Sequence, residues 1–138
     1  MLLHTQTRKW SNGPEMNSAR YSHGCTTISS TWERSTQIIV VGGFESGSTV
    51  EILNVSSSSW FNVAKIPLED LKDNSLIASN SLQYKVYSIG GRYSESILTK
   101  AIYGLTYSNT WIHVGDLTEG RARHTSLNVA RKDIPGCF

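Results

Sequence analysis

The segment from residue 37 to residue 60 constrains the fold of this chain more than any other. An uninterrupted apolar run, residues 38–41, stops at the pair Gly42-Gly43, and a short polar loop and a second apolar segment then lead to Trp60. A short β-branched run without polar alternation is typical of a strand buried on both faces, and a glycine pair is typical of a sharp turn or a close backbone approach. The segment therefore predicts two β-strands joined by a loop that begins with glycine.

The same order of features returns one unit later in the chain. The apolar run 86–89 stops at Gly90-Gly91, a loop follows, and the apolar segment 101–105 leads through a polar turn to Trp111. The two units therefore contain the same strand and turn signals in the same order.

The spacing of these features indicates a repeat of about 50 residues. The distance is 48 residues from Gly43 to Gly91, 50 from Trp10 to Trp60 and 51 from Trp60 to Trp111. A fixed period in which each unit carries only strand signals is typical of a β repeat architecture. A third marker agrees with this period, because Arg20-x-x-His23 recurs 101 residues later as Arg121-x-x-His124.

These features together resemble the kelch repeat. That family opens with an Arg-x-x-His-like motif and continues with an apolar strand ending in Gly-Gly, a Val-Glu-x-x-Asp/Asn strand and a Trp after a polar turn. The segment Val50-Glu51-Ile52-Leu53-Asn54, followed by Trp60, matches the pattern in residue type and spacing. The resemblance implies an all-β fold, a β-propeller made of four-stranded antiparallel blades.

The repeat divides the chain into four parts. Residues 1–19 are expected to end a preceding blade, residues 20–67 and 68–117 to form two complete blades, and residues 118–138 to begin a further blade and end irregularly. A ring needs four to eight blades, so this chain holds too few to close one. The eight predicted strands are residues 23–29, 37–42, 49–55, 59–64, 75–79, 85–90, 100–105 and 110–114.

The repeat markers have structural interpretations. The Trp side chains are predicted to fill the space between blades, since a large aromatic contributes much of such a core, and the Arg and His side chains are predicted to hold the turns between blades by hydrogen bonds. The second unit departs from the pattern, with Lys72 and Ser75 interpreted as replacing the Arg and His, and Ile102 replacing Glu51. The structural markers are Gly42, Gly43, Gly90, Gly91, Trp60, Trp111, Arg20, His23, Arg121 and His124.

Composition argues against several function classes. The 13 Lys and Arg and the 11 Asp and Glu give a net charge of +2 and are scattered without a basic run, so neither nucleic acid nor membrane is an expected partner. Cys25 and Cys137 fit neither a disulfide framework nor a zinc spacing. No signal or spanning segment is evident, which favours a cytoplasmic protein. We expect no cofactor, no metal and no catalytic residue, because no acid or nucleophile stands beside the histidines in sequence.

The resemblance implies a protein–protein interaction module, such as the substrate-recognition part of a ubiquitin ligase adaptor. In a propeller the loops after each Gly-Gly and the turns that open each blade emerge on one side. Arg and aromatic side chains are enriched at binding hot spots, and arginine favours an acidic or phosphorylated peptide. Self-association through open blade edges is also expected. The predicted partner-binding residues are Arg92, Tyr93, Arg123, Tyr21, Phe44 and Glu45.

Two alternatives remain open from the sequence. One is a fragment of a propeller enzyme resembling galactose oxidase, whose copper site needs a tyrosine joined to a cysteine, for which Cys25 is the candidate. The other is a secreted, glycan-binding kelch protein, in which the sequon at Asn54 would carry a glycan.

Overall fold

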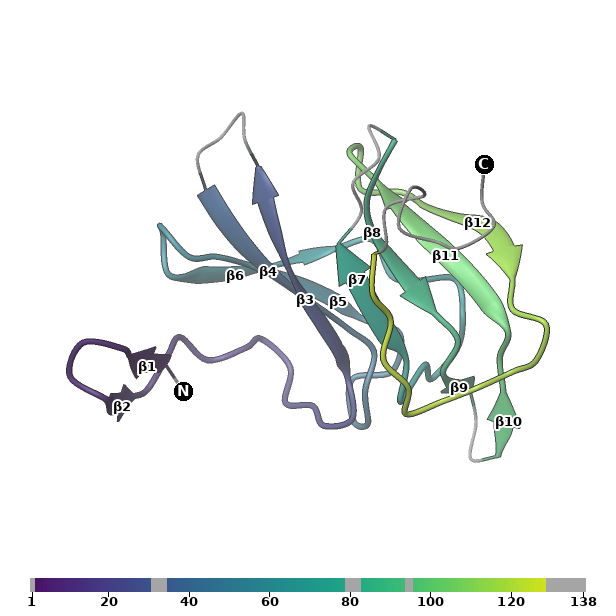
Figure 1. Cartoon of the computed structure of the whole chain (residues 1–138), viewed down its shortest axis with the longest axis horizontal. Coiled ribbons are helices and arrows are strands. Elements are labelled where there is room, and N and C mark those ends of the chain that lie inside the picture. The colour runs from purple at the N-terminus through teal and green to yellow at the C-terminus, as the bar shows by residue number, and fades with distance from the viewer. Residues whose placement is uncertain (1, 31–34, 79–82, 94–95, 129–138) are drawn as a thin grey trace, which may run out of the picture.

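All helices and strands in the part of the chain that the structure describes are β-strands, joined by turns and irregular loops. The structure is a computed structural model, and it describes residues 2–30, 35–78, 83–93 and 96–128. Cys137 and the predicted irregular C-terminus after residue 128 lie outside these ranges. The described residues form two four-stranded antiparallel sheets and two small hairpins and contain no helix (Figure 1).

The first sheet contains the segment that dominates the sequence pattern. Its strand order is the chain order, and Ile39 on the second strand pairs with Thr26 on one side and Ile52 on the other. The predicted strand ends agree with the observed ones to within two residues. The strands are β3 (Gly24–Ser30), β4 (Ser35–Val41), β5 (Val50–Asn54) and β6 (Ser59–Val63).

The second sheet repeats this topology one period later. Its strands also follow chain order from one edge to the other, and a short hairpin of β9 (Arg92–Tyr93) and β10 (Ile97–Leu98) is inserted between its middle strands. The pairing of its last two strands is offset at Ile102 and Tyr103, which makes Val114 the extra residue of a bulge. The strands are β7 (Ser75–Ala78), β8 (Tyr84–Ile89), β11 (Ala101–Thr106) and β12 (Trp111–Asp116).

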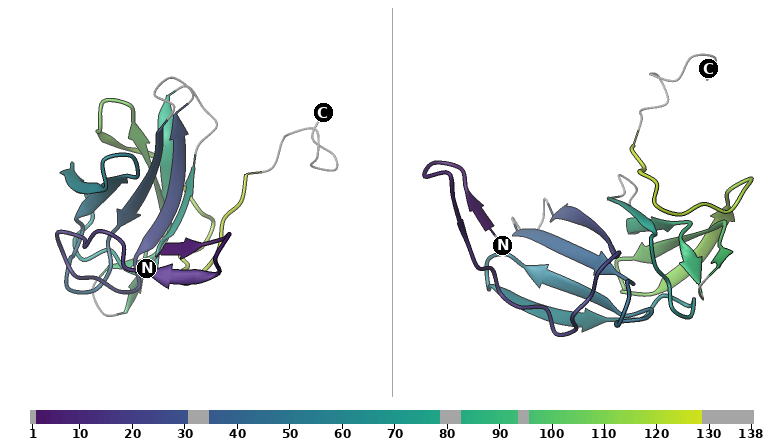
Figure 2. Two further views of the ribbon diagram at one scale, coloured as in Figure 1. Left: turned by 90° about the vertical axis from the view of Figure 1, so that its left-hand side faces the viewer. Right: turned by 90° about the horizontal axis from the view of Figure 1, so that it is seen from below.

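The hydrophobic core lies between the two sheets, which stand side by side with β3 next to β7 (Figures 1 and 2). Alternate residues of each strand point to one face of a sheet. Here the buried faces meet, and each fully buried aliphatic side chain contributes roughly 1.5–3 kcal/mol. The core residues are Ile28, Ile39, Val41, Val50 and Ile52 of the first sheet, Leu76, Val86, Leu105 and Trp111 of the second, and Ile66 and Leu71 from the connection between them.

An N-terminal hairpin stands apart from both sheets. It consists of β1 (Leu2–His4) and β2 (Lys9–Ser11), with Leu3 paired to Trp10 as Leu53 is paired to Trp60 in the first sheet. This matching register makes the hairpin equivalent to the outer half of a four-stranded sheet. Figure 1 shows it linked to β3 by an extended segment.

Backbone hydrogen bonds join the sheets in a pattern that repeats with the sequence. The N–H of Gly43 donates to the carbonyl of Leu71 at 2.8 Å, and the N–H of Gly91 donates to the carbonyl of Arg121 at 2.7 Å. The preceding glycines, Gly42 and Gly90, have φ of 69° and 56°. A Cβ added to Gly42 would come within 2.2 Å of the Leu71 oxygen. Both the conformation and the close approach therefore require glycine at this position.

Two predicted alignments were wrong. Ser88 pairs with Tyr103 as Val40 pairs with Glu51, so Tyr103, not Ile102, replaces Glu51 in the second sheet. The other error concerns the turn that opens the second sheet. Isolated bridges pair Tyr21 with Phe44 and Lys72 with Arg92, so that Lys72 is the counterpart of Tyr21. The residues that replace Arg20 and His23 in the second sheet are therefore Leu71 and Asn74, not Lys72 and Ser75. The predicted alignment is therefore shifted by one residue.

Candidate functional site

The turns that open the two sheets and the loops after the two glycine pairs meet at one end of the molecule, the lower end in Figure 1. Six side chains contact one another there, and we call them the cation–aromatic cluster. They come from three successive repeats: two aromatic residues, three cations and one carboxylate. The members are Tyr21, Phe44, Lys72, Asp73, Arg92 and Arg123.

The aromatic half of the cluster is a stacked pair. The rings of Tyr21 and Phe44 lie 4.6 Å apart between centroids and are nearly parallel, at 5°. The Nζ of Lys72 lies 4.3 Å from the Phe44 centroid, and the guanidinium carbon of Arg92 lies 5.2 Å from it. Because Tyr21 covers one face of the Phe44 ring, the ammonium lies over the other face, where the ring quadrupole attracts it.

The charged half of the cluster is organised by Asp73. Its Oδ2 lies 2.6 Å from the Nε of Arg92 and 3.5 Å from the Nε of Arg123. The Asp73 side chain is 5% exposed, whereas that of Arg123 is 74% exposed. One carboxylate thus holds two guanidinium groups, and with Lys72 the cluster keeps two positive charges in excess.

Backbone contacts fix the cluster residues in place. Lys72 and Arg92 exchange two hydrogen bonds of 2.9 Å, and Phe44 N–H donates to the Tyr21 carbonyl at the same distance. Asp73 and Arg123 both have positive φ, 52° and 54°, as Ser22 does at the equivalent position of the first repeat, 55°. Three successive repeats therefore use the same turn conformation, which an L-residue adopts only where the surrounding structure imposes it.

Sequence reasoning found four of the six cluster residues. The predicted Tyr21, Phe44, Arg92 and Arg123 come together, whereas Glu45 and Tyr93 take no part in the ring and ion-pair contacts given above. Glu45 is exposed, and Tyr93 is 37% exposed.

Lys72 and Asp73 were missed. Asp73 stands between Ser22 and Arg123 in the repeat alignment, and the one-residue shift in that alignment hid this relation. The bridge between Lys72 and Arg92 joins residues that are 20 apart in sequence, and no local motif predicts it.

The predicted structural arginine of the first repeat lies in a buried ion pair. Arg20 pairs with Glu51, and both side chains are fully buried. The Nη1 of Arg20 also donates to the carbonyls of Gly42 at 3.0 Å and Thr49 at 3.1 Å. Glu51 in turn accepts hydrogen bonds from the backbone N–H groups of residues 17 and 18. This network ties the opening turn to β5.

The two repeat histidines lie beside the glycine pairs. His23 approaches Gly43, and His124 approaches Gly90. Among the described residues, Nδ1 of His23 and both ring nitrogens of His124 have no hydrogen-bond partner, so the hydrogen bonds predicted for these atoms are not formed. Burial lowers the pKa of both imidazoles from the usual 6.5, and the neighbouring charges of Arg20 and Arg121, respectively, lower it further. Both rings are therefore neutral at pH 7. Within the described residues, no three His, Cys, Asp or Glu side chains are close enough together to hold a metal ion.

The two repeat tryptophans make the same contact. The indole Nε1 of Trp60 donates to the Pro14 carbonyl at 3.0 Å, and that of Trp111 donates to the Ala64 carbonyl at 2.9 Å. Trp111 is buried between the sheets at 8% exposure, whereas Trp60 is half-buried. The difference arises because a complete sheet precedes Trp111, while only an extended segment passes Trp60.

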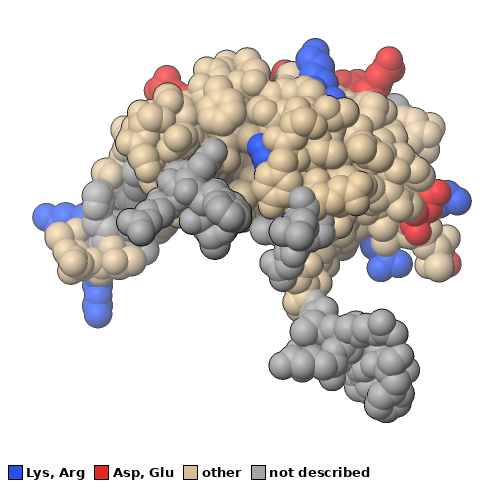
Figure 3. All heavy atoms as spheres, turned by 90° about the horizontal axis from the view of Figure 1, so that it is seen from above, with Lys and Arg blue, Asp and Glu red and all other residues tan. Residues whose placement is uncertain are grey.

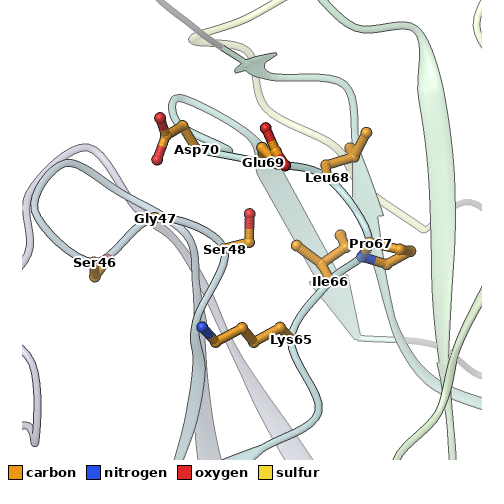
Figure 4. Close-up of a pocket in the computed structure, with 9 residues that line it drawn as sticks. All are labelled: Ser46, Gly47, Ser48, Lys65, Ile66, Pro67, Leu68, Glu69 and Asp70. Atoms are coloured by element: carbon orange, nitrogen blue, oxygen red, sulfur yellow. The ribbon is translucent and has the colours of Figure 1, made fainter.

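A pocket near the cluster end of the molecule is lined by side chains of opposite charge. Its volume is about 570 Å³, and its walls are the loop 46–48 and the connection 65–70. Figure 4 shows Lys65 on the opposite side of the hollow from Glu69 and Asp70. Charges of both signs on opposite walls do not converge on one ligand group, so this hollow is a weaker candidate than the cluster.

Charged residues are distributed differently at the opposite end of the molecule. On the visible part of that face, basic and acidic side chains are scattered mainly along the outline (Figure 3). The cluster end, in contrast, has two cations at the Phe44 ring and a third at Asp73.

The described residues contain no helix that could cross a membrane. No protein family and no curated protein matches the sequence. Among solved structures, the one titled "Structure of YjhT", a propeller-type fold, matches 85% of this chain with a TM-score of 0.65 and 16% sequence identity. The chain spans 34% of the length of that structure. The predicted fold class, an all-β partial propeller of four-stranded antiparallel blades, is confirmed. We therefore refer to the first and second sheets as the first and second blades.

Proposed function

We propose that this partial propeller is a protein-interaction module whose cation–aromatic cluster binds an acidic or phosphorylated peptide loop. The observation that carries the proposal is the arrangement around Asp73, which holds Arg92 and Arg123, while Arg92 also lies against the stacked ring of Phe44. Guanidinium groups bind carboxylate and phosphate oxygens in a bidentate manner, which gives both affinity and orientation. The role proposed here is binding rather than catalysis.

The charge and exposure of the cluster support this choice of ligand. Its three cations outnumber its one carboxylate, and the 74% exposed side chain of Arg123 is accessible to an incoming anion. Tyr21, 55% exposed, offers an aromatic surface in the same cluster, stacked on Phe44. Arginine and tyrosine are enriched among binding hot spots, and groups already fixed by backbone contacts lose little entropy when a ligand binds.

We also propose that the blades are of the kelch type. The support is the combined pattern of glycine pair, Val50-Glu51 strand and repeat Trp, at a period of about 50 residues. A cytoplasmic substrate receptor of a ubiquitin ligase is one setting in which such a surface would act.

The test compares Arg123→Glu with Lys100→Glu, a control at another exposed cation. The probe is an array of acidic peptides synthesised with and without phosphoserine, followed by titration of the best peptide in solution. We expect Arg123→Glu to raise the dissociation constant at least about tenfold, which is 1.4 kcal/mol, and the control to leave it within about twofold. The melting temperature should not change in Lys100→Glu and should fall only slightly in Arg123→Glu, which loses its contact with Asp73; circular dichroism at the titration temperature verifies that both are folded.

Undiminished binding by Arg123→Glu would remove the cluster from the binding site. A preference for the phosphorylated peptides would identify phosphate as the ligand group, whereas equal binding would identify carboxylate. If no peptide of either kind binds, the proposed ligand class is wrong.

A further inference from the structure

Two of the cations in the cation–aromatic cluster, Lys72 and Arg123, keep donor groups that the described part of the chain does not use. The third cation, Arg92, lies 2.6 Å from the Asp73 carboxylate and is the closer of its two partners. Donors of a charged group that are left unfilled show which acceptors the cluster can still take up.

The ammonium of Lys72 is held by an aromatic ring and not by a carboxylate. Its Nζ lies 4.3 Å from the Phe44 centroid, and among the described residues it makes neither an ion pair nor a hydrogen bond. The residue is half-buried, and its backbone exchanges two hydrogen bonds of 2.9 Å with Arg92. The cation–π contact keeps the ammonium in place but uses none of its N–H groups as a hydrogen-bond donor to oxygen.

The guanidinium of Arg123 is held at one nitrogen. Its Nε lies 3.5 Å from Oδ2 of Asp73, and within the described ranges the side chain has no other ion pair and no hydrogen bond. The N–H of Arg123 donates to the Asp73 carbonyl at 2.9 Å, which fixes the backbone. Both Nη groups are therefore available on a side chain that is 74% exposed. These two groups form an edge that binds a pair of oxygens.

Arg92 connects Lys72 with Arg123. It pairs with Lys72 in an isolated antiparallel bridge, and side chains at directly opposite positions of such a pair lie close together. It also shares the carboxylate oxygen of Asp73 with Arg123. The two cations with unused donors are therefore linked through one residue of the same cluster.

The charge of the cluster distinguishes between the two ligand groups considered above. Three cations and one carboxylate leave an excess of two positive charges. A carboxylate carries one negative charge and two oxygens, so it fills the edge of Arg123 and leaves the Lys72 ammonium without an acceptor. A phosphate monoester carries about −1.5 to −2 charge at pH 7 and three acceptor oxygens. It matches the excess charge and keeps one oxygen for the ammonium.

We propose that the cluster binds a phosphorylated side chain in preference to a carboxylate, and that Lys72 is the residue that determines this preference. Arg123 binds two of the phosphate oxygens, and the ammonium of Lys72 binds the third. The inference rests on the proposed function, because it names the ligand group of the same site. Since Phe44 and the bridge to Arg92 already hold Lys72, little side-chain entropy is lost when the phosphate binds.

The test uses two peptides that differ in one residue, phosphoserine or aspartate, on the sequence that binds best in the array of acidic peptides. Each is titrated against the unaltered chain and three variants. Lys72→Met removes the ammonium and keeps a long side chain against the Phe44 ring, and Lys72→Arg keeps the charge. The control is Lys65→Met, at an exposed lysine that makes none of the cluster contacts. Circular dichroism verifies that each variant is folded.

We expect the unaltered chain to bind the phosphoserine peptide at least about tenfold more tightly than the aspartate peptide. Lys72→Met should weaken phosphoserine binding at least about fivefold and change aspartate binding by less than about twofold. Lys72→Arg should retain the preference, and Lys65→Met should leave both affinities unaltered. A role of Lys72 in the fold alone would weaken the binding of both peptides alike.

Equal affinity of the unaltered chain for the two peptides would overturn this inference and leave the proposed function standing. The same conclusion would follow if Lys72→Met weakened both peptides by the same factor. If neither peptide binds to the unaltered chain, the proposed function fails, and this inference fails with it.

A measurement on the unaltered chain decides the question if Lys72→Met does not fold. The side-chain NMR signals of Lys72 must shift when the phosphoserine peptide is added and shift much less with the aspartate peptide at equal saturation. Equal shifts with both peptides would overturn the assignment of Lys72.

Discussion

The turns that open the first and second blades have the same backbone and different chemistry. In both blades, the second glycine of the pair donates its N–H to a carbonyl in the opening turn of the following repeat, from Gly43 to Leu71 at 2.8 Å and from Gly91 to Arg121 at 2.7 Å. In the first blade the neighbouring side chains are Arg20 and Glu51, a fully buried ion pair. In the second, Leu71 replaces the arginine and is itself fully buried.

This comparison separates what the repeat needs from what it can exchange. The glycines and the hydrogen bonds between blades recur, because any residue with a Cβ would collide with the carbonyl opposite. The side chains packed next to these glycines need only fill the space and leave no buried polar group without a partner. A buried ion pair and an apolar pair of similar volume can be nearly equivalent in stability, whereas half of an ion pair cannot remain buried without a large cost.

The largest effect is expected from breaking the ion pair of the first blade. Glu51→Ala would leave the Arg20 guanidinium buried without its carboxylate, which costs about 3–5 kcal/mol in the free energy of unfolding. The double variant Arg20→Leu/Glu51→Ile replaces the ion pair by two apolar side chains, with the leucine that the second blade has in place of Arg20, and should lose less stability than Glu51→Ala alone. Urea unfolding at pH 7 measures all three proteins. A double variant less stable than the single one would show that the first blade depends on charge specifically.

The second prediction compares the two repeat tryptophans. Trp111→Ala removes a buried side chain and its 2.9 Å hydrogen bond to Ala64, so we expect a loss of about 3–5 kcal/mol. Trp60→Ala should cost about half as much in the monomer, because the indole is half-buried against the extended segment. Unfolding curves at a concentration where the chain is monomeric provide the comparison. Equal losses would mean that the N-terminal segment covers Trp60 as well as a complete blade covers Trp111.

Much of the fold could be predicted from the sequence because its signals are local. The glycine pairs and apolar runs placed all eight blade strands to within two residues. The exchange of Arg20 for Leu71 could not be predicted, since it preserves the backbone geometry while changing the charge and the hydrogen-bonding groups that a motif records. The candidate site was predicted only in part. Phe44 and Arg92 could be predicted because they directly follow the glycine pairs, which are local signals. Asp73 could be predicted only from a correct alignment of the opening turns.

The smallest effect is expected on the pH dependence of stability, through the last residue of each opening turn. His23 and His124 occupy this position in the first and third repeats, whereas Asn74 occupies it in the second and donates to Ser88 Oγ at 3.0 Å. Burial, assisted by Arg20 and Arg121, lowers the pKa of both histidines in the folded chain below the unfolded value of 6.5. The unfolded chain therefore binds more protons below about pH 6.5, so stability is constant above that pH and falls as the pH decreases through it.

His23→Asn introduces the residue of the second blade and removes one of these titrating groups. We expect the variant to be slightly less stable at pH 8, because Val40 stands where Ser88 would accept the hydrogen bond of the asparagine. Between pH 7 and 5.5, above the range in which carboxylates mainly titrate, its stability should fall less steeply than that of the unaltered chain. Urea unfolding at half-unit steps of pH gives both slopes, and equal slopes would mean that His23 takes up its proton as readily in the folded chain as in the unfolded one.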